Sequence, residues 1–315
     1  MTAMRIVFCG TPEFAVPSLR RLAAETNISV EAVVTQPDRP RGRGQHVSDS
    51  PVKEAAIEAG LHVYQPETIK SAPAQEFLQR VAPDAVVIIA YGQIVPARLL
   101  TIPRLGWINL HASLLPRYRG AAPIHWAIAN GESVTGLTTM QIDAGMDTGP
   151  ILLQRELEIG PDETAPELAA RMSEMGAGLV VDSLWQLDRG EISPRPQDPQ
   201  AACYAPILKK DDGRIEWLRT ARQIYNRIRG FAPWPGAYTT FRGQTCHLWG
   251  RPERGAAAEG HMAPGEIVHS TKDVYVVCGE GTCLRLESVQ LEGRKRILAR
   301  EFANGARLVP GDHFV

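Results

Sequence analysis

Apolar runs without alternation mark the first 190 residues of the chain. Three of them lie at residues 5–9, 30–35 and 84–90. Continuous runs of this kind are typical of strands that are buried on both faces of a parallel sheet. Helical stretches are expected at about residues 14–24, after the first run, and at residues 163–188. The order of strand, helix and strand predicts a doubly wound α/β domain with a mostly parallel sheet.

The pattern changes after this region. Three prolines occur within residues 192–199, and proline continues neither a helix nor a central strand. We therefore predict an extended linker at 191–206 between a first domain, 1–190, and a second domain, 207–315. The second domain is expected to contain a helix at 219–229 and a small β-barrel, because five short apolar runs alternate with Gly-containing turns. These runs are 237–241, 246–249, 265–268, 274–278 and 283–286.

Composition and the length of the apolar runs argue against a secreted protein and against a membrane-spanning one. With 44% hydrophobic and 22% charged residues over 315 positions, the chain is typical of soluble proteins with two cores. No secretory signal is recognisable, and the apolar runs are far shorter than the roughly 20 residues of a membrane span, so a cytoplasmic protein is expected. From Pro206 onward, 17 Lys and Arg stand against 12 Asp and Glu, which indicates an anionic partner for the second domain.

Common cofactor motifs are missing from the sequence. The first strand ends in Gly10-Thr11-Pro12 instead of G-x-G-x-x-G, and no G-x-x-x-x-G-K-[ST] occurs, so neither a nicotinamide nor an ATP site is predicted. The five scattered cysteines lack the spacing of a zinc site. We expect no metal site, and we interpret the cysteines as buried thiols.

Residues 107–116 (WINLHASLLP) carry the most informative polar pair. Asn109 and His111 alternate with Ile108 and Leu110, so their side chains are expected on one face at the end of a strand. An amide donor beside an imidazole could stabilise an oxyanion and handle a proton. Taken alone, however, the pair also fits a loop cap and a structural histidine.

A carboxylate follows in a loop flanked by glycines. Asp147 lies between Gly145 and Gly149, and glycine permits close approach of a backbone to a ligand. A carboxylate near the imidazole of His111 would orient that ring. By itself, Asp147 also fits an ordinary turn residue.

Together these residues resemble the signature of the folate-dependent formyltransferases. The match consists of Asn109-x-His111-x-Ser-Leu-Leu-Pro-x-Tyr-x-Gly, with Asp147 in Met-Asp-Thr-Gly-Pro 38 residues after Asn109. The resemblance implies a Rossmann-like formyltransferase domain followed by an OB-like barrel. It implies 10-formyltetrahydrofolate as formyl donor and no metal. The residues it implies are the catalytic Asn109, His111 and Asp147 and the folate-binding Ser113, Leu114, Leu115 and Pro116.

Four further segments resemble the branch of that family whose acceptor is methionyl-initiator tRNA. They are residues 8–15, 36–44, 117–124 and 231–236. The second is a basic, glycine-containing loop, whose Arg39, Arg41 and Arg43 could contact phosphates. Lys209 and Lys210 beside the linker could meet the tRNA backbone, and the family expectation for the oligomeric state is a monomer. Each of these cations also fits a solvated surface charge.

Three alternatives remain open at the level of the sequence. The acceptor could be a small amine such as a sugar nucleotide, although such an acceptor has no need of the arginine-rich loop. Water could be the acceptor, which would make the chain a formyltetrahydrofolate hydrolase. The chain could also be an RNA-binding protein with an inactive catalytic domain, against which the intact Asn109, His111 and Asp147 argue.

Overall fold

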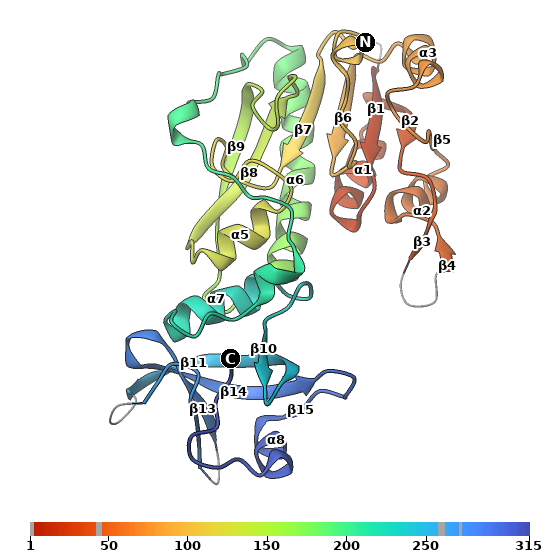
Figure 1. The fold of residues 1–315 in the computed structure, drawn as a ribbon. Helices are drawn as coiled ribbons and strands as arrows, with labels where there is room; N and C mark the ends of the chain where they lie inside the picture. The colour runs from red at the N-terminus through yellow and green to blue at the C-terminus, as the bar shows by residue number, and fades with distance from the viewer. Residues whose placement is uncertain (1–2, 42–45, 258–261, 271–272) are drawn as a thin grey trace. The chain divides into compact units, whose positions relative to one another are not determined.

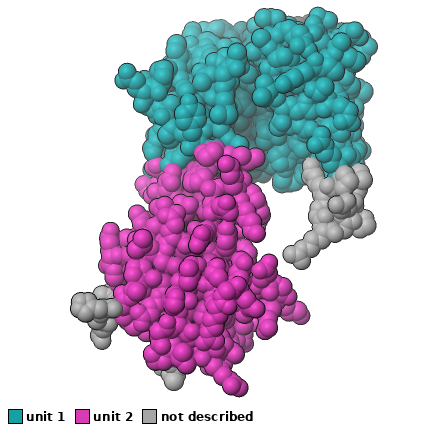
Figure 2. Space-filling model, viewed as in Figure 1, with its two compact units in different colours: residues 1–123, 134–158, 168–205 teal, residues 124–133, 159–167, 206–315 magenta. Residues whose placement is uncertain are grey.

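The computed structural model describes residues 3–41, 46–257, 262–270 and 273–315. They form two compact units, which Figure 2 distinguishes by colour. Unit 1 comprises residues 1–123, 134–158 and 168–205, and unit 2 comprises residues 124–133, 159–167 and 206–315. Arg43 of the predicted tRNA-binding loop lies outside the described residues. No helix in these ranges has both the length and the apolar character needed to cross a membrane.

Unit 1 is built on a sheet that has seven strands within the described residues, in the order β5-β2-β1-β6-β7-β8-β9 (Figure 1). The pairs from β5 to β7 are parallel, and β8 and β9 are antiparallel to their neighbours. The strands are β1 (Met4–Gly10), β2 (Ile28–Val34), β5 (Val63–Tyr64), β6 (Ala85–Ile89), β7 (Trp107–His111), β8 (Val134–Gln141) and β9 (Ile151–Glu158). This mixed, mostly parallel α/β sheet confirms the fold class predicted from the apolar runs.

Two helices of unit 1, α2 (Pro51–Glu58) and α3 (Ala72–Val81), begin at serines that cap them. Ser50 accepts a hydrogen bond from the Lys53 amide at 3.1 Å, and Ser71 accepts one from the Ala74 amide at 3.3 Å. A proline follows each serine within the first turn, where its missing N–H costs nothing. The helices are α1 (Val16–Ala23), α2 (Pro51–Glu58), α3 (Ala72–Val81), α4 (Ala97–Leu100) and α6 (Ala165–Asp188). The short strands β3 (Arg39–Arg41) and β4 (His46–Ser48) form a separate antiparallel pair.

The segment predicted as a linker packs against unit 1 up to Ala205. Ile151 and Arg195 exchange backbone hydrogen bonds of 2.8 Å, which adds residue 195 to the edge strand β9. Further along, the Arg119 amide donates to the Cys203 carbonyl at 2.9 Å, and the Ala205 amide donates to the Arg119 carbonyl at 2.7 Å. The proline-rich segment is therefore part of unit 1, and the chain passes to unit 2 only after Ala205.

Unit 2 contains an antiparallel sheet in the order β10-β11-β14-β13-β12, with β15 paired to β14. Its strands are β10 (Tyr238–Phe241), β11 (Gln244–Ala257), β12 (Ile267–His269), β13 (Val274–Val277), β14 (Thr282–Leu291) and β15 (Ile297–Leu298). Its helices are α5 (Pro123–Ala129), which starts at the end of unit 1, α7 (Ala221–Gly230) and α8 (Ala299–Ala306). Short 3-10 helices lie at Lys210–Gly213 and Gly279–Gly281 in unit 2, and at Glu13–Ala15 and Pro199–Ala201 in unit 1. The antiparallel β domain predicted for this half of the chain is confirmed.

Residues 312–315 close this sheet into a barrel. On one side Thr240 of β10 and Val315 exchange backbone hydrogen bonds of 3.0 and 2.9 Å. On the other side the Ile267 amide donates to the Asp312 carbonyl at 2.8 Å, and the Phe314 amide donates to the Gly265 carbonyl at 2.9 Å. The two edge strands, β10 and β12, thus share one bridging segment, and neither edge is left open at that point.

Replacing Phe314 with alanine is expected to lower the free energy of unfolding of unit 2 by about 3–5 kcal/mol, because a buried ring is lost. Its ring is 2% exposed and lies 5.5 Å from Phe241 and 5.7 Å from Trp217, between ring centroids. Denaturant unfolding measures the change. The neighbouring Val315→Ala is the matched control, since Val315 is 58% exposed and its backbone pairing survives. Equal losses in the two variants would contradict the role of the ring.

Most of the cysteine thiols are buried, as predicted. Cys9, Cys246, Cys278 and Cys283 are buried and Cys203 is half-buried, and all five are free. Burial raises the pKa of Cys246 and of Cys278 to about 12. Neither of these two is therefore a reactive thiolate at neutral pH.

Candidate active site

Strand β7 places Asn109 and His111 on one face of the sheet. On the opposite face, the side chain of Leu110 lies against α6, where a Cβ on Gly176 would meet its methyl group at 2.5 Å. The strict alternation of a strand then directs residues 109 and 111 away from α6. β7 ends at His111, so both side chains lie near the carboxyl end of a parallel strand, where open α/β sheets bind ligands.

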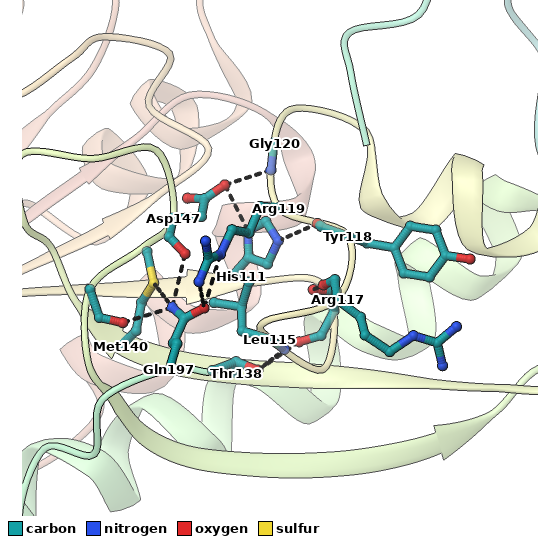
Figure 3. Close-up of polar contacts among 12 residues, drawn as sticks. His111, Leu115, Arg117, Tyr118, Arg119, Gly120, Thr138, Met140, Asp147 and Gln197 are labelled. Atoms are coloured by element: carbon teal, nitrogen blue, oxygen red, sulfur yellow. Dashed lines mark hydrogen bonds and ion pairs between the residues drawn. The ribbon is translucent and has the colours of Figure 1, made fainter. Parts of the chain in front are cut away.

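His111 is held by main chain on one edge of its ring and faces a carboxylate on the other (Figure 3). Nε2 lies 2.9 Å from the Tyr118 carbonyl oxygen, and Nδ1 lies 3.7 Å from Oδ2 of Asp147. A carbonyl only accepts, so Nε2 carries a hydrogen and Nδ1 is the edge left for proton chemistry. The imidazole is 6% exposed, so a proton held between Nδ1 and the Asp147 carboxylate is shielded from water.

Asp147 is directed toward His111 by an unusual backbone. Its φ of 53° is left-handed, a conformation that aspartate tolerates better than most residues. Oδ2 accepts a hydrogen bond of 2.7 Å from the Gly120 amide, which itself follows a turn with left-handed φ at Tyr118. Gly149 is required on the other side, since a Cβ there would lie 1.8 Å from the Gln141 carbonyl oxygen. The structure thus brings together His111 and Asp147, which sequence reasoning could pair only through the family resemblance.

The amide of Asn109 makes no side-chain hydrogen bond to another residue in the described part of the chain. The residue is half-buried, so its amide is shielded and still reachable. The trio therefore presents an amide, the Nδ1 edge of an imidazole and a carboxylate from two neighbouring segments.

Two further residues support the Asp147 loop, and sequence reasoning assigned a role to neither. Gln197 donates from Nε2 to the carbonyl oxygens of Asp147 at 2.9 Å and Gly149 at 2.7 Å. Its Oε1 accepts from Nη2 of Arg119 at 2.7 Å and from Nε at 3.1 Å. Arg119 is 5% exposed and Gln197 is half-buried, and Figure 3 draws the contacts between them. No spacing rule could have found this contact, because Gln197 lies 50 residues after Asp147 in a segment that reads as linker.

Changing Gln197 to glutamate is expected to lower both stability and turnover. The new carboxylate still accepts from Arg119, but it cannot donate to the carbonyl oxygens of Asp147 and Gly149, which then face a negative charge without a hydrogen bond. Loss of such bonds costs about 1–3 kcal/mol. Thermal unfolding and kcat for formyl transfer measure the effect, with the exposed Gln200→Glu as matched control. A Gln197→Glu variant that matches Gln200→Glu in both readouts would contradict the supporting role.

The segment predicted to bind folate is a structured loop. The hydroxyl of the fully buried Ser113 donates to the Arg117 carbonyl at 2.6 Å, and the Ser113 carbonyl accepts from Oγ1 of Thr138 at 2.7 Å. Leu115 is 3% exposed and packs with Met140 and Ile151. These two side chains are thereby committed to the loop itself. The groups of this segment that remain available to contact folate are the backbone and the half-buried side chains of Leu114 and Pro116.

Comparisons with known proteins identify the family. Residues 4–184 match the family described as formyl transferase, and residues 207–307 match the formyl transferase C-terminal domain. The methionyl-tRNA formyltransferase of Solibacter usitatus is 53% identical, with 98% of each chain covered. That of Geobacter metallireducens is 50% identical, over 99% of this chain and 98% of the relative. The chain belongs to the methionyl-tRNA formyltransferase family.

Solved structures confirm the fold of this methionyl-tRNA formyltransferase family member at lower identity. An N-formyltransferase from Helicobacter canadensis, solved with folinic acid and dTDP-3-aminofucose, is 18% identical with a TM-score of 0.64 and covers 91% of this chain and 99% of that one. HypX from Aquifex aeolicus in complex with tetrahydrofolic acid is 15% identical with a TM-score of 0.61, over 100% of this chain and 51% of that one. The family expectation from the sequence is confirmed, and the chain is a folate-dependent formyltransferase.

Those of the cations predicted to bind tRNA whose side chains the structure describes are at the protein surface. Arg39 at the start of β3 is exposed, as are Lys209 and Lys210. The side chain of Arg41 lies outside the described part of the structure, as does the whole of Arg43. Within the described ranges, no group of three or more His, Cys, Asp or Glu residues could hold a metal ion.

Proposed function

We propose that this enzyme transfers the formyl group of 10-formyltetrahydrofolate to the α-amine of methionyl-initiator tRNA at Asn109, His111 and Asp147. One observation carries the proposal for the centre: Nδ1 of His111, the edge not bound to main chain, faces the Asp147 carboxylate at 3.7 Å. Asn109 shares the face of β7 with His111, so an amide donor lies beside this acid–base pair.

The reaction forms a C–N bond at the formyl carbon and then breaks the bond from that carbon to the folate nitrogen. Attack by the amine gives a tetrahedral intermediate with a negative oxygen, which the Asn109 amide stabilises by donating a hydrogen bond and which His111 stabilises when its Nδ1 carries a proton. A preorganised donor of this kind acts on charge that develops only in the transition state. In the half-buried site its effect is stronger than it would be in water.

Proton balance is the task of Asp147. The attacking amine must lose a proton, and the departing folate nitrogen must gain one. We assign this relay to the Asp147 carboxylate, directly or through one water, with His111 oriented by the same carboxylate. Main-chain hydrogen bonds hold both side chains in place during transfer. His111 is bound to the Tyr118 carbonyl, and Asp147 is bound to the Gly120 amide.

The substrates are assigned to two regions. Folate is placed at the loop of Ser113, Leu114, Leu115 and Pro116, next to the trio. Residues 207–315 form the tRNA-binding domain of the proposal, with phosphate contacts from Lys209 and Lys210 there and from Arg39, Arg41 and Arg43 in the first domain. We further propose a cytoplasmic monomer, with residues 1–190 as the catalytic domain and 191–206 as the connection.

A formyl-transfer assay tests the function. Purified protein is incubated with 10-formyltetrahydrofolate and either charged methionyl-initiator tRNA, uncharged tRNA or free methionine. Formylated methionyl-tRNA with no product from free methionine is the expected result. Folate turnover without formylated tRNA would overturn the acceptor and direct the search to small amines and to water.

A further inference from the structure

The hairpin formed by β3 and β4 lies beside α2 in unit 1 (Figure 1). Lys53, in the first turn of α2, joins the two ends of this hairpin. Its ammonium group donates to the carboxylate of Asp38, which directly precedes β3, and at 2.8 Å to Oδ1 of Asp49, which directly follows β4. We call these three residues the neck of the hairpin. One lysine thus ties the two strands together where they leave the rest of unit 1.

The neck is fastened to the α/β sheet at both of its ends. At one end, the buried hydroxyls of Ser50 and Thr35 lie 2.8 Å apart and connect the start of α2 to the residue that follows β2. At the other end, Nε2 of Gln65 donates to the Gln36 carbonyl and to Oδ1 of Asp38, both at 2.9 Å. Both oxygens of that carboxylate are therefore engaged, one by the amide of Gln65 and the other by the ammonium group of the neck.

The place of Lys53 in α2 is unfavourable for the helix itself. A helix N-terminus carries partial positive charge, which favours acidic side chains there and basic side chains at the other end. Lys53 is the third residue of α2, and its amide donates to the capping hydroxyl of Ser50 at 3.1 Å. The partners of this cation are the neck carboxylates. Hydrogen bonds to Asp38 and then to Asp49 raise the pKa of Lys53, so it stays charged at neutral pH.

Arg39 follows the neck and is the first residue of β3. Its backbone pairs with Ser48 of β4, so its position depends directly on the two ends that the neck joins. The side chain is exposed and forms no salt bridge to another described residue, although Asp38 is its neighbour in sequence. Both neck carboxylates are bound to the lysine instead. A guanidinium in this position can meet a phosphate without first breaking an ion pair.

We propose that Lys53 is a positioning residue for the tRNA substrate: by tying Asp38 to Asp49, it holds Arg39 where that side chain meets a backbone phosphate. The inference rests on the proposed function, which supplies the tRNA. Lys53 is not itself the phosphate contact, because its side chain is 17% exposed and its protons are shared between two carboxylates. Its effect is therefore indirect, and it concerns the binding of tRNA and not the chemistry at the catalytic trio.

Substitution of Lys53 tests the tie. Lys53→Met keeps most of the length of the side chain and removes its charge. We expect KM for methionyl-tRNA to rise about tenfold, as when one charge-assisted hydrogen bond is lost, because Arg39 is no longer held in place. The value of kcat at saturating tRNA and KM for folate should stay unchanged, which is the pattern of a loss in binding alone. Lys53→Arg keeps a cation between the two carboxylates and should recover part of the affinity for tRNA.

The matched control is Lys70→Met, at an exposed lysine of the same unit whose side chain forms no salt bridge to another described residue. It removes the same charge, and KM for methionyl-tRNA should remain that of wild type. An equal rise in the two variants would attribute the effect to net charge and overturn the inference. Equal KM values in wild type and Lys53→Met would also overturn it and leave the proposed function intact. A wild-type enzyme that formylates no tRNA would overturn the function itself.

Replacing Asp49 separates positioning from simple charge. Removing a carboxylate near bound RNA relieves repulsion and should by itself strengthen binding. The tie predicts the opposite for Asp49→Ala, in which KM for methionyl-tRNA should rise, because Lys53 then holds only one strand of the hairpin. Glu54→Ala removes an exposed acid from the same turn of α2 and is the control, in which KM should not rise. An Asp49→Ala enzyme whose KM is no higher than that of Glu54→Ala would overturn the positioning role.

Discussion

Replacing Asn109 with alanine is expected to lower kcat for formyl transfer by about 100- to 1000-fold. This is the usual loss when one preorganised donor to an oxyanion is removed. The KM values for folate and tRNA should change little, because the donor acts on a charge that neither substrate carries in the ground state. Steady-state kinetics with varied methionyl-tRNA measures the effect.

Folding of the Asn109→Ala variant should be unimpaired. The amide makes no side-chain hydrogen bond to another described residue, so no structural partner is left unsatisfied. Asn304→Ala, at an exposed position of α8, is the matched control and should retain full activity. An Asn109→Ala enzyme with a kcat near that of this control would remove Asn109 from the catalytic trio.

Replacing Asp147 with asparagine is expected to lower turnover by about a thousandfold, within the range of general acid–base catalysis. Asparagine has the same shape, keeps an oxygen for the Gly120 amide and tolerates the left-handed φ of 53°. What it lacks is the charge that accepts a proton and orients His111. Single-turnover measurement of formyl transfer separates this loss from any change in substrate binding.

Asp143 in the same loop provides the control for Asp147. Its carboxylate accepts from the Thr148 hydroxyl at 2.7 Å and from the Gly145 amide at 3.0 Å, and so has a structural task. Asp143→Asn should reduce activity far less than Asp147→Asn. Comparable losses in the two variants would attribute the effect to the geometry of the loop and not to the charge on Asp147.

Sequence patterns predicted the scaffold of this protein well, because burial on two faces leaves a direct signature. Residues 85–90 are an uninterrupted apolar run, and the corresponding strand β6 (Ala85–Ile89) is buried at every position. Alternation across residues 107–111 likewise predicted that Asn109 and His111 share a face, and the structure has a strand over these residues, β7 (Trp107–His111). Both inferences are local, since the period of a strand is set by its own backbone.

The partnership of His111 with Asp147 was beyond any local rule. The connection between β8 and β9 brings Asp147 to the carboxyl end of β7, and its course depends on the left-handed Tyr118 and Asp147 and on the missing Cβ of Gly149. Family resemblance supplied the pairing. Patterns of hydrophobicity could not, because one charged residue in a glycine-rich loop has many structural uses.

What the sequence by itself determined is therefore the mostly parallel α/β character of the first domain, the β character of the second, the polar face of β7 and, through resemblance, the formyltransferase family. Only the tertiary structure decided that Gln197 supports the Asp147 loop and that residues 312–315 close the barrel. Gln197 fell in the predicted linker, and no element was predicted at residues 312–315, because extended chain can form its hydrogen bonds with the backbone of many different partners. Such partners are set by the folded arrangement of distant elements, and residue type and spacing carry no trace of them.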